Sequence, residues 1–413
     1  DKEVCPIFIF RWVYNQVMYK NKIYFFLIPS FIHLLVFIPF LIQSNIGSDW
    51  DAYSLIGTFL IFEETGQYLP SRPPGFPLYE FIIGFILKFS FYSFENFERL
   101  LLVFQFITTV FLNYLLFLFF KRDDKFNLPL YLITIFSPIY LISGLTVIDY
   151  LLGSLCGFSA IYFLQINKKN NLIPILLALS IAIRLSNVIF VIAVLVFQLQ
   201  KKEWRDGIYL LLKTFIFSLL LYFPTHLNLI QYLRNLNYKI FEATCILNLT
   251  NTDHTLIDRL GRFFLKQINY FGLIAFILFL YCLVKSKPLF KEEHIPFYII
   301  FLLFEISFLR LPTEEGHLIP AYIAFLLIVK DFNISKVLSF IAVVFVLLSS
   351  IYDLKFYTVD TVDGATDAEF KLYFQSGFLI EEYKIRNNIE DKNFHYFNSK
   401  ETLKAAWENG CPN

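Results

Sequence analysis

Two carboxylates lie close together just beyond the first long hydrophobic run of the chain. Asp49 and Asp51 follow the run that ends at Gln43, and the sequence Arg72-Pro73-Pro74-Gly75-Phe76-Pro77 comes shortly after them. Burying a carboxylate in hydrocarbon is costly, so an acidic pair at a membrane surface is either solvated or held in a polar cavity. Because the proline-rich run restricts the backbone, it favours an ordered loop and therefore the polar cavity.

Such a pair could do acid–base chemistry. A carboxylate within hydrogen-bond reach of a hydroxyl can remove its proton as a general base. Asp49 is the predicted base and Asp51 the alternative, while a solvated loop acid or a helix N-cap is the competing interpretation of Asp49. Two carboxylates this close could also hold a divalent cation. The sequence predicts no other cofactor.

A cation close to the acidic pair could bind phosphate. The guanidinium of Arg72 is planar and suits phosphate oxygens, with which it can make two parallel hydrogen bonds. The competing interpretation is that Arg72 only pairs with Glu63, with Glu64 or with a lipid headgroup.

Composition assigns the chain to a class. Hydrophobic residues make up 57% of the 413 residues, aromatic residues 20% and charged residues 17%, and there are 52 Phe. This exceeds the apolar share of a soluble domain and indicates a polytopic membrane protein. The net charge of +1 argues against a strongly basic nucleic-acid binder, and the six His and five Cys show no metal-ligand spacing, so no metal site is predicted.

The apolar runs predict an all-α polytopic fold. A run of about 20 helical residues crosses the roughly 30 Å hydrocarbon layer. We expect about eleven transmembrane helices by this measure. The predicted spans are Ile23–Gln43, Leu100–Phe120, Leu130–Thr146, Tyr150–Ile166, Leu172–Ser186, Val188–Leu199, Ile208–Thr225, Tyr270–Val284, Ile295–Leu309, Leu318–Val329 and Val337–Ile351.

Basic residues between the spans predict the orientation. Alternate breaks are rich in Lys and Arg, which favours the cytoplasmic side for these breaks. They carry Lys121, Arg122, Lys125, Lys168, Lys169, Lys201, Lys202, Arg205, Lys285, Lys287, Lys291, Lys330 and Lys336. The segment Phe76–Phe91 is assigned to a helix in the outer interface, because counting it as a span would place three of the basic breaks outside. Ala52–Glu63 is predicted to be a second, short interfacial helix.

These assignments divide the chain into regions. Residues 1–22 form a cytoplasmic N-terminal segment, 23–352 the transmembrane domain and 353–413 an extracytoplasmic C-terminal segment, expected to be a small domain or cap. Within the transmembrane domain, 44–99 is the first outer loop and 226–269 a long outer loop. The long loop is unusually basic for the outside, with Arg234, Lys239, Arg259, Arg262 and Lys266. It is either an amphipathic surface on anionic headgroups or part of a phosphate site.

Several motifs in this order resemble a known family. They are Asp49 with Tyr53, Gly66-x-Tyr68, the run Arg72 to Leu78, Asp149 and Arg184 at outer helix ends, and the run Leu311-Pro312-Thr313-Glu314-Glu315-Gly316-His317-Leu318-Ile319-Pro320. Together they resemble the C-type superfamily of integral membrane glycosyltransferases, most closely the protein O-mannosyltransferase and aminoarabinose transferase branch. The chain departs from the family where it has Asp49-Trp50 in place of Asp-Glu, and where His317 stands in place of a more usual Tyr.

The resemblance implies an activity and roles for residues. It implies an inverting hexosyl- or pentosyltransferase that moves a sugar from a polyprenyl-phosphate donor to a hydroxyl of a glycan, lipid or protein. The implied location is the outer face of a bacterial inner or plasma membrane, with no nucleic-acid partner. Catalysis falls to Asp49 and Asp51, and binding of the donor and its phosphate to Arg72, Tyr68, Arg184 and His317, while Asp149 and Glu315 would orient the acceptor or a cation.

Two other classes of function stay open. A polymerase or ligase of lipid-linked glycans would share the composition, although it would be expected to carry basic and His groups in a large late loop. A transporter or flippase could use Arg184 and Glu305 along a translocation path, but the internal repeat typical of transporters is not visible. Cys245 and Cys411 are the two cysteines predicted outside, where a disulfide between them is conceivable.

Overall fold

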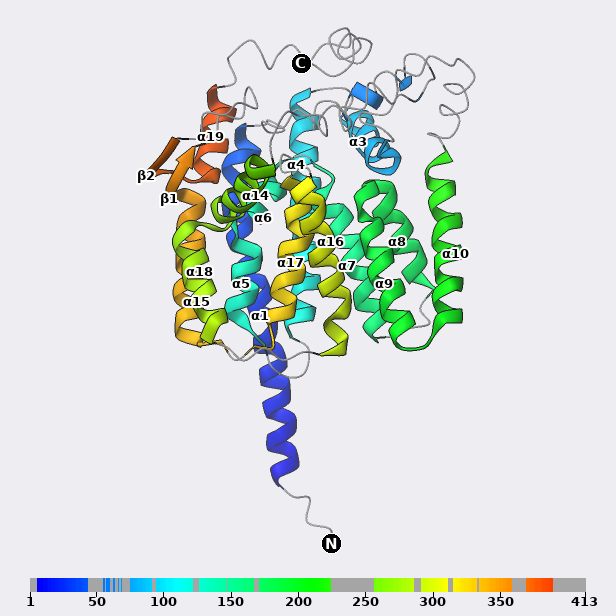
Figure 1. Cartoon of the computed structure of the whole chain (residues 1–413), viewed down its shortest axis with the longest axis horizontal. Coiled ribbons are helices and arrows are strands. Elements are labelled where there is room, and N and C mark those ends of the chain that lie inside the picture. The colour runs from blue at the N-terminus through cyan, green and yellow to red at the C-terminus, as the bar shows by residue number, and fades with distance from the viewer. Residues whose placement is uncertain are drawn as a thin grey trace.

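The computed structural model describes residues 6–43, 55, 57–59, 62–63, 66, 68, 75–90, 94–121, 126–146, 148–166, 171–223, 256–285, 291–310, 315–332, 334–358 and 369–388. This part of the chain is a helical bundle with one two-stranded antiparallel sheet (Figure 1). The predicted all-α class is therefore correct for the bundle, while the small sheet was not predicted.

The helices follow the apolar runs of the sequence. They lie side by side and run alternately between the two ends of the bundle (Figure 1). The bundle helices are α1 (Pro6–Gln43), α4 (Phe94–Phe120), α5 (Leu128–Phe136), α6 (Pro138–Leu145), α7 (Tyr150–Ile166), α8 (Leu172–Ile183), α9 (Val188–Gln200), α10 (Trp204–Leu221), α15 (Leu273–Lys285), α16 (Ile295–Arg310), α17 (Leu318–Val329) and α18 (Lys336–Ile351). The first part of α1 extends beyond the others (Figure 1).

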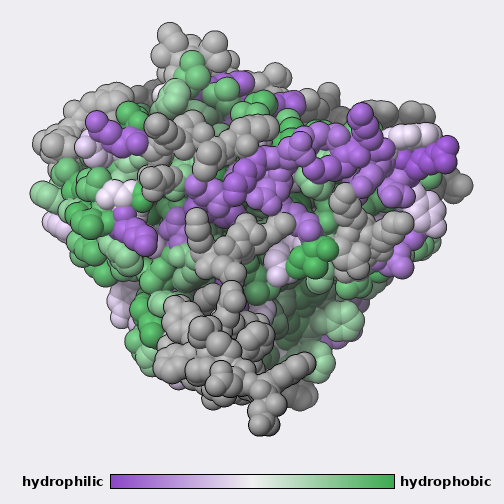
Figure 2. Space-filling model, turned by 90° about the horizontal axis from the view of Figure 1, so that it is seen from below, coloured by the Kyte–Doolittle hydropathy of each residue, from purple (hydrophilic) through white to green (hydrophobic). Residues whose placement is uncertain are grey.

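The Lys- and Arg-rich connections meet at one end, called here the basic end. Lys201 pairs with Glu292, Lys291 pairs with Asp331, and the Lys330 ammonium donates to the Phe119 carbonyl oxygen at 3.0 Å. These contacts join the connections that follow α4, α9, α15 and α17. Figure 2 looks onto this end, where a band of hydrophilic residues crosses the face.

Length and hydropathy identify fewer spans than the sequence predicted. Among the described residues, Tyr24–Gln43 and Asn96–Phe120 are long and apolar enough to cross a membrane, which gives two spans. The number rises to four if each of two bent helix pairs counts as one span. The remaining apolar helices are shorter. Membrane character is thus supported, and the number of about eleven spans, which came from counting apolar runs, is not confirmed.

The sides of the bundle are apolar. On α10 the exposed residues are mainly large hydrophobic ones, among them Ile208, Leu212, Phe215 and Leu220. Such a helix face is typical of contact with lipid, because a soluble bundle would cover that face with charged residues.

A bend of 49° separates α5 from α6. Pro138 causes it, because proline has no amide hydrogen to give to the carbonyl oxygen of Thr134. The Ser137 hydroxyl donates to that oxygen instead, at 3.1 Å. The backbone acceptor left by the proline therefore stays satisfied inside the apolar bundle.

A buried polar network surrounds this bend. His33 Nε2 lies 2.8 Å from the Ile135 carbonyl oxygen, and Asn113 Nδ2 lies 2.8 Å from His33 Nδ1. The Tyr140 hydroxyl donates to Asn113 Oδ1 at 2.7 Å. Since both ring nitrogens of His33 have partners, the network fixes α1 and α4 to the bend with little unsatisfied polarity.

Helix α3 (Pro77–Phe89) lies at the opposite end from the basic end (Figure 1), and we call that the α3 end. Pro77 opens the helix at a position where proline is well tolerated. Tyr79, Ile83 and Leu87 are fully buried in a small core with Phe97 of α4. The sequence predicted a helix here, and the described residues among 55–63 are also helical.

Helix α14 (Leu256–Phe271) meets α15 at 97°. Gly272 forms the corner with φ +92°, a conformation that glycine adopts without strain. Helix α14 carries Arg259 and Lys266, so the last part of the basic outer loop is a helix that crosses the α3 end (Figure 1).

The chain continues from α18 into a hairpin and a helix. Strand β1 (Tyr352–Thr358) pairs antiparallel with β2 (Glu369–Ser376), and α19 (Phe378–Asn388) follows. Arg386 of α19 donates from Nη2 to the Leu145 carbonyl oxygen at 2.9 Å. The described part of the C-terminal segment thus packs on the α3 end. Cys245 and Cys411 lie outside the described residues.

Candidate functional site

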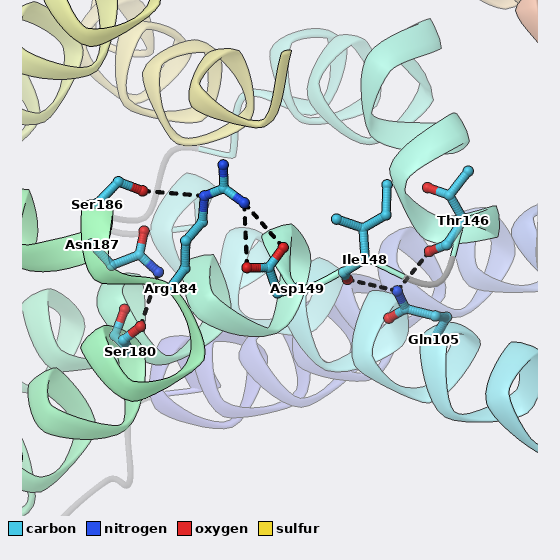
Figure 3. Close-up of polar contacts among 8 residues, drawn as sticks. All are labelled: Gln105, Thr146, Ile148, Asp149, Ser180, Arg184, Ser186 and Asn187. Carbon is cyan, nitrogen blue, oxygen red and sulfur yellow. Dashed lines mark hydrogen bonds and ion pairs between the residues drawn. The ribbon is translucent and has the colours of Figure 1, made fainter. Parts of the chain in front are cut away.

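A buried ion pair joins α7 to α8 at the α3 end. Arg184 Nη1 lies 3.0 Å from Oδ1 and 3.3 Å from Oδ2 of Asp149 (Figure 3). The side chains are 7% and 0% exposed. Removing two ions from water costs free energy. The attraction between them offsets this cost only when their geometry is good and their other polar atoms are hydrogen-bonded. The sequence predicted both residues at outer helix ends, and the structure brings them into direct contact.

Local structure around Arg184 fixes its side chain. The residue ends α8 with an extended backbone, φ −154° and ψ 119°. Its Nε donates to the Ser186 hydroxyl at 3.1 Å, and the guanidinium carbon lies 4.3 Å from the centre of the Tyr150 ring. A guanidinium over an aromatic face gains cation–π attraction, which increases when water is excluded.

Close packing of α7 on α8 makes the pair possible. The Ser180 hydroxyl donates to the Gly153 carbonyl oxygen at 2.7 Å, and Asn187 Nδ2 donates to the Ser180 carbonyl oxygen at 3.1 Å. A Cβ on Gly153 would lie 2.3 Å from Asn187 Nδ2. A larger residue at position 153 would displace the Asn187 amide that bonds to the Ser180 carbonyl.

Gln105 of α4 holds the turn that carries Asp149. Its Nε2 donates to the carbonyl oxygens of Thr146 and Ile148 at 2.7 and 2.8 Å (Figure 3). Both carbonyls belong to the connection between α6 and α7. The position of Asp149 thus depends on a third helix.

A second carboxylate and two phenols lie near the pair: Glu80 and Tyr79 belong to α3, and Tyr68 precedes that helix. The Tyr68 hydroxyl donates to the Glu80 carboxylate, and both side chains are buried. Burial, together with the negative charge of Glu80, raises the pKa of Tyr68 well above its ordinary value. Burial and the nearby charge of Asp149 likewise raise the pKa of Tyr79. Both phenols are therefore neutral.

The connection before α17 completes the site. Glu315, in the short 3₁₀ helix η4 (Glu315–His317), pairs with Lys266 of α14. A Cβ on Gly316 would lie 2.2 Å from the Tyr150 ring, so this turn packs on the same ring that contacts Arg184. His317 is buried, with its ring centre 5.9 Å from that of Phe304.

The described candidates therefore gather at one end of the bundle. Asp149 and Arg184 are in contact, and Gly316 connects the η4 turn to them through Tyr150. Glu315 pairs with Lys266, and this ion pair would compete with its predicted role in orienting an acceptor or a cation. Asp49, Asp51 and Arg72 lie outside the described residues, and their roles stay predictions.

Three further residues at this end were not predicted, and Lys266 was predicted only as part of the basic outer loop. Glu80, Gln105, Tyr79 and Lys266 contact or approach the predicted ones. Glu80 and Gln105 could have been identified from the sequence, because each is a polar residue within a strongly apolar run. Tyr79 carried no such signal, because its neighbours come from distant parts of the chain.

Comparisons with known proteins add no relative: no family model, curated protein or solved structure matches the chain.

Proposed function

We propose that this protein is a membrane glycosyltransferase that moves a sugar from a polyprenyl-phosphate donor to an acceptor hydroxyl, with inversion at the anomeric carbon. The reaction needs a base at the hydroxyl and a cation at the phosphate that leaves. Asp49 is the proposed base, with Asp51 as alternative, and Arg72 is the proposed phosphate ligand.

The observation that carries the proposal is the buried pair of Arg184 and Asp149. A buried ion pair in a membrane protein indicates a functional role, because an apolar pair of similar volume is often equally stable. A rigid guanidinium at the α3 end supplies positive charge where a lipid phosphate would develop negative charge. Asp149 then orients Arg184, and this replaces its predicted role toward the acceptor.

The membrane arrangement is part of the proposal. We infer that the helices of the bundle cross the membrane about eleven times, with the bent pair α5 and α6 counted as one crossing. The basic end lies in the cytoplasm by the positive-inside rule. The α3 end then faces outward, with α3 and α14 at the interface. This places the site on the extracytoplasmic face of a multi-pass protein of the plasma membrane.

The base is tested with purified protein and a panel of radiolabelled polyprenyl-phosphate hexoses and pentoses, with and without a membrane extract as acceptor source. Asp49→Asn keeps shape and hydrogen bonding but accepts no proton, so transfer should fall about 10²-fold or more. Donor binding should survive. A larger loss in Asp51→Asn would transfer the role to Asp51, and near wild-type turnover in both single variants and the double variant would contradict the mechanism.

Binding of the donor phosphate tests Arg72. Arg72→Ala should weaken donor binding by about 1.5–3 kcal/mol, the range for a hydrogen bond to a charged group. Arg72→Lys should recover part of the loss, because one cation returns without the two-pronged geometry. Arg205→Ala, an exposed arginine at the basic end, is the matched control and should bind donor normally. Equal affinity in Arg72→Ala and the control would exclude the phosphate role.

A further inference from the structure

A second group of charged side chains lies at the basic end, far along the bundle from the site described above. Glu293 and His294 belong to the short 3₁₀ helix η3 (Glu292–His294), which leads into α16. Asp331 lies in the connection between α17 and α18. One donor atom from each of the three side chains lies within 4.8 Å of the other two.

His294 is the informative member of this group. Its side chain is 1% exposed, and its Nδ1 has no hydrogen-bond partner among the described residues. Leaving a buried polar atom unsatisfied costs about 1–3 kcal/mol. Nε2 lies 3.2 Å from Asp331 Oδ2. Two ligands of a tetrahedral zinc, each bound at about 2.0–2.1 Å, are separated by about 3.3 Å.

Both turns that carry the group are held from outside it. Gln165 Nε2 donates to the Glu293 carbonyl oxygen at 3.1 Å, which fixes η3 to the end of α7. Asn127 Nδ2 donates to the Lys330 carbonyl oxygen at 3.0 Å, which fixes the turn before Asp331. The donors are therefore preorganised, and the side chains of Glu293 and Asp331, 29% and 21% exposed, leave a path from water.

Lys291 now balances the two carboxylates. Its ammonium lies 2.5 Å from Asp331 Oδ2 and 3.7 Å from Glu293 Oε1. Its side chain is 38% exposed on a long stem, so it can turn into water when another cation arrives. A nearby ammonium also repels a metal ion, and this lowers the affinity of the site without removing its ligands.

We propose that Glu293, His294 and Asp331 form a binding site for a divalent metal of the zinc type, with water in the open position. One imidazole nitrogen and two carboxylate oxygens suit zinc, whose protein ligands include both. The bound ion would connect the start of α16 to the turn between α17 and α18. The site is independent of glycosyl transfer, because it lies at the other end of the bundle.

The test uses the full-length protein in detergent, without a histidine tag and after treatment with a chelator. Titration with Zn²⁺ by calorimetry should show one site per chain, and Co²⁺ should give the visible absorption of a low-coordinate ion. Thermal unfolding should shift upward with Zn²⁺. His294→Ala and Asp331→Asn should each lose the site, whereas Glu292→Gln, which removes the neighbouring carboxylate outside the group, should keep it.

Lys291→Met should increase the affinity for Zn²⁺, a result that misfolding could not produce. Removing the competing ammonium should tighten Zn²⁺ binding about tenfold or more, by relief of repulsion at close range. Unchanged Zn²⁺ binding in His294→Ala and Asp331→Asn, or absence of binding in Lys291→Met, would overturn the proposal. Neither outcome depends on whether the protein transfers sugar.

Discussion

Arg184 is held by contacts of three kinds: a carboxylate, a hydroxyl and an aromatic ring. Each restricts the guanidinium in a different direction, so the side chain has little freedom. A guanidinium held this firmly keeps its N–H groups in a fixed direction, which a mobile lysine could not do.

Removing this cation should be costly. Arg184→Met leaves Asp149 buried without its cation, and we expect the free energy of unfolding to fall by about 3–5 kcal/mol. The double variant Asp149→Leu with Arg184→Met should recover most of that stability, because no buried ion remains. Both are measured by denaturant unfolding in detergent. Additive losses in the double variant would show that the pair does not act as a unit.

At the scale of elements, short turns decide which helices meet. The η4 turn packs flat on Tyr150 because Gly316 has no side chain, and this keeps the ring over Arg184. The same turn carries Glu315 to Lys266, so α14 and α7 are connected through the two consecutive residues Glu315 and Gly316. A change in this turn therefore reaches the ion pair without touching it.

Gly316→Ala tests that connection. The new Cβ would lie 2.2 Å from the Tyr150 ring, so the ring or the turn must move, and overpacking of this kind costs about 1–3 kcal/mol. Gly261→Ala in α14 is the matched control, since a Cβ there meets nothing within 4 Å. It should be neutral or stabilise by up to about 1 kcal/mol. Thermal unfolding compares the two, and equal melting temperatures would contradict the packing argument.

The sequence predicted elements better than contacts. Apolar runs located the bundle helices, and the polar residues Asp149 and Arg184 marked two of their ends. Their direct contact could not be predicted, because it depends on how Gly153 lets α7 approach α8. The His294 group was missed for the same reason: Glu293 and His294 are adjacent, but Asp331 joins them only through the packing of α16 on α17.

For the whole molecule, the two ends differ in charge and so predict an orientation. Reporter fusions after Asp124, Lys169, Lys202 and Lys287 should read cytoplasmic, because these positions follow the basic connections. Fusions after Asn45, Ile148, Arg310 and Asp353 should read extracytoplasmic. An outside signal at Asp124 would place α3 across the membrane and contradict the site assignment.

Several bundle helices are too short to cross the full hydrocarbon layer. Helix α8, with 12 residues, rises about 18 Å, whereas the hydrocarbon layer is about 30 Å thick. The turns at both of its ends must therefore enter the interface, or the bilayer must thin locally around α8 and α9. Arg184 at the end of α8 would then lie in the interface, at the depth of a lipid phosphate.

The contact of Arg386 with the Leu145 carbonyl spans 241 positions of the chain. A ribosome that adds about 5–20 residues per second needs roughly 12–48 s to pass from one to the other. During that interval the Leu145 carbonyl lacks the partner that it has in the finished structure. The α3 end, where the proposed chemistry is located, is therefore completed only after α19 has been synthesised.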